Sequence, residues 1–243
     1  MTTIQVIQFT QHPHPWHALA EALGLTANGE KNDAWTEFDG DGMLALHAVD
    51  ASDPRVGTAE VWMLVDDDDA LADLETQLSA AGIAVIRGAM EGVGATLEIA
   101  LDPHSTIHAV VGHARAPRGD TAILPLFFTP NVPASTNVAT TLELKPRTSS
   151  DAGTWADLTA PGGGILALHA EHAAQTPDAS PVSLSLEYRG NLDALAERLT
   201  DANFENSVVD EAYNRTLILS TPDGNELWVN GAQTDLYGYT EHT

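Results

Sequence analysis

The chain has no cysteine among its 243 residues. This absence excludes disulfide bonds, thiolate metal ligands and cysteine nucleophiles, and it is compatible with a reducing compartment. Long hydrophobic runs are also missing, because no apolar stretch approaches the ~20 residues that cross a bilayer. The first residues lack a basic segment followed by an apolar one, so we expect no secretory signal and a cytoplasmic protein.

Positive charge is scarce. The sequence has 10 lysine and arginine residues against 35 aspartate and glutamate residues, which gives a formal net charge of -25. A surface of this sign repels phosphate backbones and anionic membranes. We therefore expect neither a nucleic-acid partner nor a membrane partner.

Two local clusters have an ordinary explanation. The acids from Asp66 to Asp69 precede an apolar helical pattern, and carboxylates are favoured at a helix N-terminus. A calcium loop is the alternative, but it would space its oxygen ligands around a glycine. The histidines between His12 and His17 alternate with prolines, which predicts an extended surface turn before a helix that starts at Trp16.

The chain also repeats itself. The heptapeptide GMLALHA returns 122 positions later as GILALHA, and two further landmarks precede it in the same order. The matched residues are Phe9 and Phe128, Trp35 and Trp155, and Gly42 and Gly164, at offsets of 119, 120 and 122 positions. This order predicts a duplicated unit of roughly 115 to 120 residues, which is too long for a solenoid repeat. We expect two domains, residues 1–115 and 121–232, joined by a linker over 114–121.

Each copy shows the pattern β-α-β-β-β twice, which predicts an α+β fold. In the first copy we expect strands at 4–9, 34–38, 43–49, 58–65, 85, 96–101 and 107–112, and helices at 16–23 and 69–81. In the second copy we expect strands at 123–128, 154–158, 164–170, 182–188, 208–209, 216–220 and 226–229, and helices at 135–144 and 192–199. The segment from 233 onward is predicted to be irregular, with Leu236, Tyr237 and Tyr239 docking on the body.

Three segments of the second copy carry a family resemblance: GGGILALH at 162–169, the strand–helix step at 184–199 and TPDGNELW at 221–228. Their counterparts in the first copy lie at 42–47, 61–78 and 102–104. Together with the repeated βαβββ units, these segments resemble the vicinal oxygen chelate superfamily, which includes glyoxalase I, bleomycin-resistance proteins and extradiol dioxygenases. The resemblance covers about residues 3–231 and implies two tandem glyoxalase-like domains. Each would form a cupped mixed sheet with a small-molecule pocket between its two units.

In metal-dependent members a divalent cation sits in the cup, held by histidine or glutamate side chains on the first and last strands of the units. Such a cation polarises vicinal oxygens of the substrate. The matching positions here are Ile4, Ile123, Thr58 or Ala59, Val182 or Ser183, Trp228, and the segment Ile107 to Ala109. Neither copy assembles three ligands, so we expect no ordinary metal site and no essential cofactor. A divalent metal in a rearranged His/Glu site is the alternative.

His47 and His169 are the first candidate ligand-binding residues. Strand alternation places His47 on the face of Ala45, which the resemblance makes the cup side. Three interpretations stay open: a hydrogen-bonded structural histidine, a pocket-lining side chain, or a metal ligand.

Four more residues form a second rank of candidates: Trp62, Trp228, His108 and Glu226. Glu226 is either a general base whose pKa burial raises or a solvated strand carboxylate. The two tryptophans are either core residues or the walls of a cup for a flat ligand.

The sequence therefore predicts a glyoxalase- or bleomycin-resistance-like protein that binds a small organic molecule in a cup. One alternative is a metal-dependent lyase, isomerase or dioxygenase-like enzyme that uses His47, His169 and Glu226. A second alternative is a structural or regulatory module with filled cups. We expect a monomer or a loose homodimer, and the sequence does not assign the working pocket to either copy.

Overall fold

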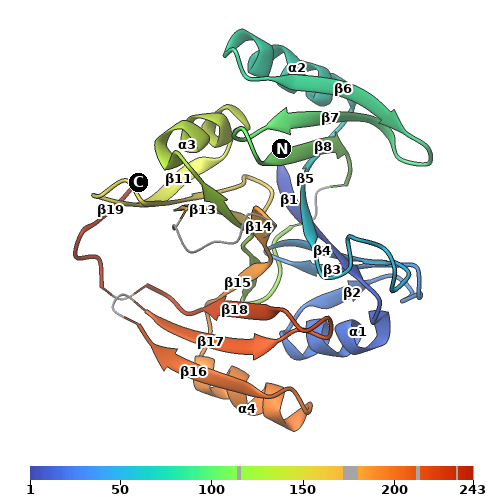
Figure 1. Cartoon of the computed structure of the whole chain (residues 1–243), viewed down its shortest axis with the longest axis vertical. Coiled ribbons are helices and arrows are strands. Elements are labelled where there is room, and N and C mark those ends of the chain that lie inside the picture. Colours follow the sequence, from blue (N-terminus) through green and yellow to red (C-terminus); the bar gives the residue numbers. More distant parts are fainter. Residues whose placement is uncertain (114–115, 172–179, 212–213, 234, 243) are drawn as a thin grey trace.

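The computed structural model describes residues 1–113, 116–171, 180–211, 214–233 and 235–242 (Figure 1). The predicted domain boundary at residue 115 and the beginning of the predicted linker lie outside these residues. Within them the chain has the α+β fold that the sequence predicts, with mixed sheets and few helices. No helix in these ranges has both the length and the apolar content to cross a membrane.

The first half of the chain forms one eight-stranded sheet. Its elements are β1 (Thr3–Thr10), α1 (Pro13–Ala22), β2 (Thr26–Asn28), β3 (Trp35–Gly40), β4 (Gly42–Ala48), β5 (Ala59–Val65), α2 (Asp68–Ala80), β6 (Val85–Met90), β7 (Gly94–Ala100) and β8 (Thr106–Val111). The strand order is β2-β3-β4-β1-β5-β8-β7-β6. The first strand of each unit pairs in parallel with the last, and β1 pairs antiparallel with β5 at the centre. Two βαβββ units are thus joined through their first strands.

The second half repeats this order, but its central strands are interrupted and it has one additional strand, β19. Its elements are β9 (Thr121–Ile123), β10 (Leu126–Thr129), α3 (Val132–Thr141), β11 (Lys145–Ser150), β12 (Trp155–Thr159), β13 (Ile165–Ala170), β14 (Val182–Ser183), β15 (Ser185–Tyr188), α4 (Leu192–Asp201), β16 (Asn206–Asp210), β17 (Arg215–Ser220), β18 (Glu226–Asn230) and β19 (Tyr239–Glu241). Both central strands are interrupted, as β9/β10 and as β14/β15, so the sheet divides into two. Pro125 lies in the first interruption and has no backbone N–H to give to a ladder.

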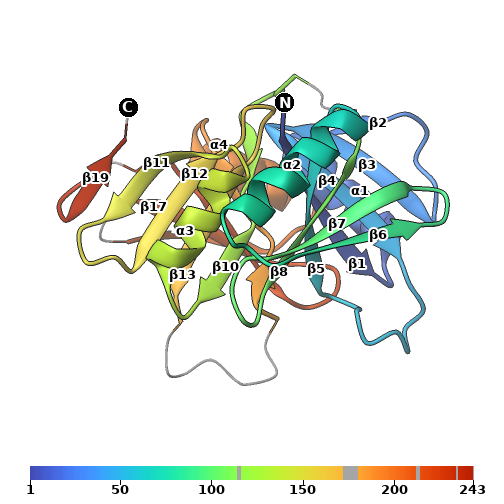
Figure 2. The same ribbon diagram turned by 90° about the horizontal axis from the view of Figure 1, so that it is seen from above.

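One apolar core runs through both halves. It contains the inward faces of the helices, with Trp16, Leu71 and Leu195 all fully buried, and the strand faces beneath them. Helix α1 contacts α4, and α2 contacts α3, so the helix-covered sides of the two halves pack against each other (Figures 1 and 2). The opposite, concave faces of the sheets are thereby left to form the site.

The repeated heptapeptide begins at the junction of the halves. The Asp41 N–H donates to the Thr121 carbonyl at 2.9 Å, and the Ile123 N–H donates back to the Asp41 carbonyl at 2.8 Å. The Asp41 carboxylate also accepts the Gly164 N–H at 2.9 Å. The glycine that starts each heptapeptide therefore lies where the two copies meet.

Helix starts follow the sequence signals in most cases. Asp67 caps α2 by accepting the Ala70 N–H at 2.8 Å, which confirms the helical interpretation of the acidic run. The predicted turn before Trp16 is wrong: α1 begins at Pro13, because proline fits the first helical turn, and Trp16 and His17 are buried. Helix α3 begins at Val132, three residues before the predicted start, because Asn131 accepts the Ala134 N–H and caps it.

The C-terminal segment is only partly irregular. Strand β19 pairs antiparallel with β11, a strand that the sequence pattern missed, and Tyr239 is half-buried at this edge. Tyr237 does not dock, since it is 93% exposed.

Candidate functional site

In the first half, the predicted residues lie on one concave face. Strand register aligns His47 with Phe9 and with Trp35, and it aligns Trp62 with His108. The rings of Trp62 and His108 stack at 4.7 Å between centroids. The side chain of Trp62 is 6% exposed, within a cluster that also includes Ile7, Phe9, Met43, Ala45, Leu64 and Val110. Apolar side chains thus pack over this face.

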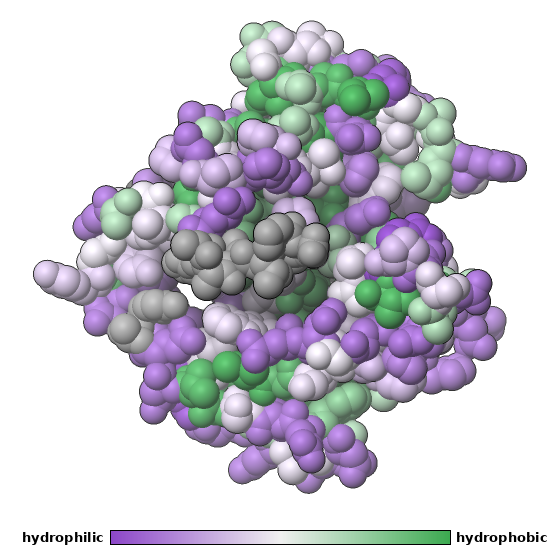
Figure 3. Space-filling model, in the orientation of Figure 1, coloured by the Kyte–Doolittle hydropathy of each residue, from purple (hydrophilic) through white to green (hydrophobic). Residues whose placement is uncertain are grey.

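In the second half, the concave face opens into a cavity of about 860 Å³. Figure 3 shows the molecule hollowed at the centre of this face. Three of the predicted residues line the cavity, namely His169, Trp228 and Glu226, whereas His47, Trp62 and His108 do not. Gln8, Gly57 and Ala59 of the first half form part of the wall.

Side-chain size at equivalent strand positions explains why one face is packed and the other is open. Trp62 aligns with His108 across β5 and β8, and Ser185 aligns with Trp228 across β15 and β18. Ser185 therefore occupies the position of Trp62. By the same register, Glu187 occupies the position of Leu64, and Asn230 occupies the position of Val110. A small side chain and two polar side chains replace the apolar packing of the first half.

Equivalent aromatic neighbours surround the repeated histidine in both halves. His47 lies 5.2 Å from Phe9 and 5.5 Å from Trp35, between ring centroids. His169 lies 5.8 Å from Phe128 and 6.0 Å from Trp155. The three landmarks of the sequence repeat therefore converge in space as a Phe-Trp-His cluster.

The ring of His169 has a defined tautomer. Its Nδ1 is 2.7 Å from the Ala170 carbonyl oxygen. Because a carbonyl oxygen only accepts, Nδ1 carries the proton, and in the neutral ring Nε2 is the acceptor nitrogen.

A buried charge cluster forms the floor of the cavity. Arg147 on β11 donates two hydrogen bonds to the Asp157 carboxylate, at 2.9 and 3.0 Å, and its Nη1 lies 2.7 Å from the Glu187 carboxylate. Burial alone disfavours the charged guanidinium, but the bonds to these two carboxylates outweigh burial and hold the pKa of Arg147 above its ordinary value. Arg147 therefore stays charged and committed to its two partners.

The cluster continues into the junction of the halves. Glu187 also accepts from Arg189 Nε at 3.2 Å, and Arg189 Nη2 lies 2.6 Å from the Asp41 carboxylate. The Asp41 carboxylate in turn accepts a hydrogen bond from the Gly164 N–H. The cavity floor is thereby tied to the first half by a continuous series of charge-assisted bonds.

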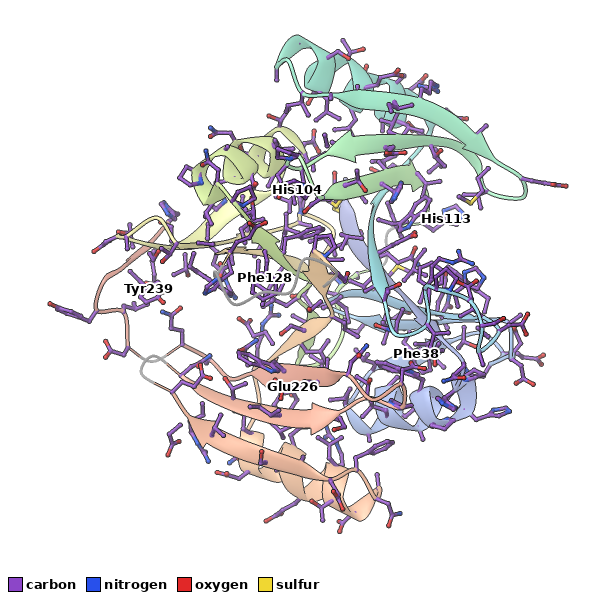
Figure 4. All side chains as sticks on the ribbon, viewed as in Figure 1. Phe38, His104, His113, Phe128, Glu226 and Tyr239 are labelled. Carbon is purple, nitrogen blue, oxygen red and sulfur yellow. The ribbon has the colours of Figure 1, made fainter. Side chains whose placement is uncertain are left out.

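A tryptophan–carboxylate pair stands at the rim. The Trp228 indole N–H donates to the Glu226 carboxylate, and Trp228 is 38% exposed. The interpretation of Trp228 as a core residue is therefore wrong, because its strand face looks into the cavity and not into the helix-covered core. Figure 4 shows Glu226, Phe128 and Tyr239 around the central opening.

The Pro-Asp-Gly-Asn turn that carries the resemblance has a structural role here. Asp223 accepts hydrogen bonds from the Trp16 indole N–H at 2.7 Å and from the Thr10 hydroxyl at 3.0 Å. Asn225 donates to the Gly57 carbonyl at 2.6 Å. The turn thus clamps the second half to the first beside the cavity.

Four cavity residues were not predicted from the sequence: Arg147, Asp157, Glu187 and Ser185. A signal was present for the charged residues. Asp157 lies between Ala156 and Leu158, and Glu187 follows a leucine in a strand, so both are acids within otherwise apolar strands. A charge in such a place is stable only with a partner, and Arg147 is that partner. Ser185 gave no signal, because its meaning depends on the strand register.

The donor set does not fit the metal centre that the resemblance implies. Among the described residues, no group of three or more His, Asp or Glu side chains could hold a metal ion. Ile4 and Ile123, at the expected opening-strand positions, are fully buried in the helix-side core.

The fold resembles that of extradiol dioxygenases of known structure. A catechol 2,3-dioxygenase is 14% identical and superposes with a TM-score of 0.63 over 99% of this chain and 94% of its own. Homoprotocatechuate 2,3-dioxygenase from Arthrobacter globiformis is 13% identical, with a TM-score of 0.60 over 96% of this chain and 79% of its own. The 2,3-dioxygenase LapB from Pseudomonas sp. KL28 is 15% identical, with a TM-score of 0.59 over 96% and 91%.

No protein-family model and no curated protein matches the sequence. The structural likeness shows the fold, and it confirms the α+β architecture of mixed sheets that the sequence predicts. At these identities it does not define an activity.

Proposed function

We propose that the protein binds a small organic molecule in the cavity of its second half, at a site that is not an ordinary metal-chelating centre. The observation that supports this most is the exchange of Trp62 for Ser185 at one register position of two equivalent sheets. The first half packs this position with an indole ring, whereas the second half has a small hydroxyl side chain there, in the wall of the cavity.

The size and lining of the cavity suit this role. Small-molecule sites are typically ~300–1,000 Å³ and combine apolar walls with a few placed polar groups, and the cavity here is about 860 Å³. Phe128, Trp155 and Trp228 supply aromatic surface, and Ser185 and Asn230 supply hydrogen-bonding groups. In this proposal His169, Trp228 and Glu226 contact the ligand, while His47, Trp62 and His108 stabilise the first half.

The fold likeness favours one alternative, a dioxygenase-like enzyme. Oxygen consumption with ferrous iron and catechol tests it, together with elemental analysis of protein purified without chelator. We expect oxygen consumption no higher than that of free iron. We also expect less than about 0.1 equivalent of bound metal, because a site with only two donor side chains binds a metal ion weakly. Stoichiometric metal that is lost in His169→Ala would favour the enzyme.

Thermal-shift screening tests the binding proposal. The panel contains small aromatic amines, alcohols and carboxylates. We expect at least one compound to raise Tm by about 2 °C or more, because a ligand that binds only the folded state stabilises it. In Ser185→Trp the shift should disappear, since the indole fills the space that Trp62 fills in the first half.

Two further variants make the result interpretable. Ser79→Trp places the same side chain on the exposed face of α2 and should keep the shift. Ser183→Trp places it at an exposed position of the cavity wall and serves if Ser185→Trp does not fold. A panel without any shift, or a shift that survives in both cavity variants, contradicts the proposal.

A further inference from the structure

The charges that line the cavity are unbalanced. Among the described lining residues the acids are Asp157, Glu187, Glu211 and Glu226, and the only lysine or arginine is Arg147. With His169 neutral, this lining has a net charge of about -3 from these formal charges. In a partly enclosed, low-dielectric space such an excess acts strongly on a charged ligand.

The single arginine does not reverse this preference. Its three hydrogen bonds go to Asp157 and Glu187, whose side chains are only 2% and 11% exposed. One positive charge already faces two carboxylates there, so an anionic ligand that reached the remaining guanidinium N–H groups would be repelled by both carboxylates. Arg147 therefore does not act as an anion receptor.

Aromatic faces accompany the carboxylates. Phe128, Trp155, Trp228 and Tyr239 all line the cavity. Cations are attracted to the faces of such rings, most strongly to tryptophan. At the rim the Trp228 indole N–H is bonded to the Glu226 carboxylate, so a ring face and a negative charge lie side by side.

We propose that the cavity selects organic cations, namely amines or quaternary ammonium compounds with an apolar or aromatic body, and discriminates against carboxylates. This inference rests on the proposed binding function and specifies its ligand class. The net charge of -25 on the whole chain adds a long-range attraction of the same sign.

Three probes with one ring system and different charges test this inference. Tryptamine is a cation, tryptophol is its neutral isostere, and indole-3-acetate is an anion of similar size. Isothermal titration calorimetry at low salt should give tryptamine an affinity roughly 10-fold or more above that of indole-3-acetate, with tryptophol between them. Raising the ionic strength to about 0.5 M should narrow the ratio, because salt screens the charge term.

A matched pair of variants locates the selectivity. Glu226→Gln should weaken tryptamine binding by about 3-fold to 10-fold and leave tryptophol within about 2-fold, because only the cation loses an attraction. Glu197→Gln removes the same charge from an exposed position on α4 that does not line the cavity. It should leave all three affinities unchanged.

The outcomes separate this inference from the binding proposal. Equal affinities for the three probes, or tightest binding of indole-3-acetate, would overturn the cation selectivity. The binding proposal would still hold if Ser185→Trp abolished binding of the probes. Equal effects of Glu226→Gln and Glu197→Gln also overturn it, because the preference would then come from overall charge. If no probe binds and the thermal-shift panel is empty, the binding proposal fails first.

Discussion

A Cβ atom placed on Gly42 would lie 2.9 Å from the Cα atom of Gly164. The first residues of the two repeated heptapeptides therefore meet back to back. Both have positive φ angles, +87° and +93°, which L-residues with side chains rarely adopt. The repeat of glycine at this position is explained by close approach of the two copies as well as by backbone conformation.

Gly42→Ala should destabilise the protein by about 2–4 kcal/mol, from the strained φ together with a clash against backbone that cannot move aside. Urea denaturation measures the change in the free energy of unfolding. Gly29→Ala is the matched control, because Gly29 also has a positive φ of +78° but no atom lies within 4 Å of a Cβ placed on it. Equal losses in the two variants would show that contact with Gly164 contributes nothing.

The asymmetry of the two halves predicts unequal effects of tryptophan removal. Trp62→Ser should cost about 3–5 kcal/mol, because it leaves a hole in a packed cluster. Trp228→Ser should cost less than about 1 kcal/mol, because that side chain is 38% exposed at the cavity. Denaturation of both variants by urea gives the comparison. A similar cost for the two would mean that Trp228 is a core residue after all.

The charge cluster of the cavity floor should contribute to stability, because removing its arginine leaves buried carboxylates behind. Arg147→Met would leave two mostly buried carboxylates, Asp157 and Glu187, without their shared partner, at a cost of about 2–4 kcal/mol at pH 7. Urea denaturation at pH 7 measures this loss in the free energy of unfolding. Arg215→Met removes one partner of an exposed pair with Asp193 and should cost much less. A loss in Arg147→Met no larger than the loss in Arg215→Met would contradict this explanation.

His17 provides a prediction about pH. Burial, followed by the positive charges of Lys31 and His14, lowers the pKa of His17 below its ordinary 6.5. The folded state therefore binds this proton less readily than the unfolded state, and His17 reduces stability as pH falls through 6.5 toward its lowered pKa. The NMR titration of the His17 ring should have its midpoint below 6.5, and His17→Gln should flatten stability between about pH 7 and 5. A midpoint at or above 6.5 would contradict the assignment.

Much of the fold could be predicted from the sequence, because period-2 and period-3.6 patterns report which face of an element is buried. The repeat from Gly42 to Gly164 and the acids before α2 gave correct elements for this reason. The start of α1 was missed because Pro13 and Pro15 were interpreted as breaking a helix that proline in fact begins. The pairing of β19 with β11 was missed because a three-residue strand has no pattern of its own.

The candidate site could be predicted only in part. Of the six candidate residues, His169, Trp228 and Glu226 line the cavity, and strand parity and the resemblance had indicated them; their role in binding stays a prediction. The sequence alone could not predict which half contains the cavity, because this depends on the equivalence of Ser185 and Trp62 in two separate sheets. The Arg147 cluster was missed because its members lie far apart in the chain and meet only after folding.

An amide chemical-shift map of the labelled protein during titration with tryptamine shows where the ligand binds. We expect perturbations to gather on β15, β18 and β13, around Ser185, Trp228 and His169, and to spare Trp62 and His108 in the first half. Perturbations centred on the first half, or scattered over the acidic surface without saturation, would contradict the claim that the cavity of the second half is the binding site.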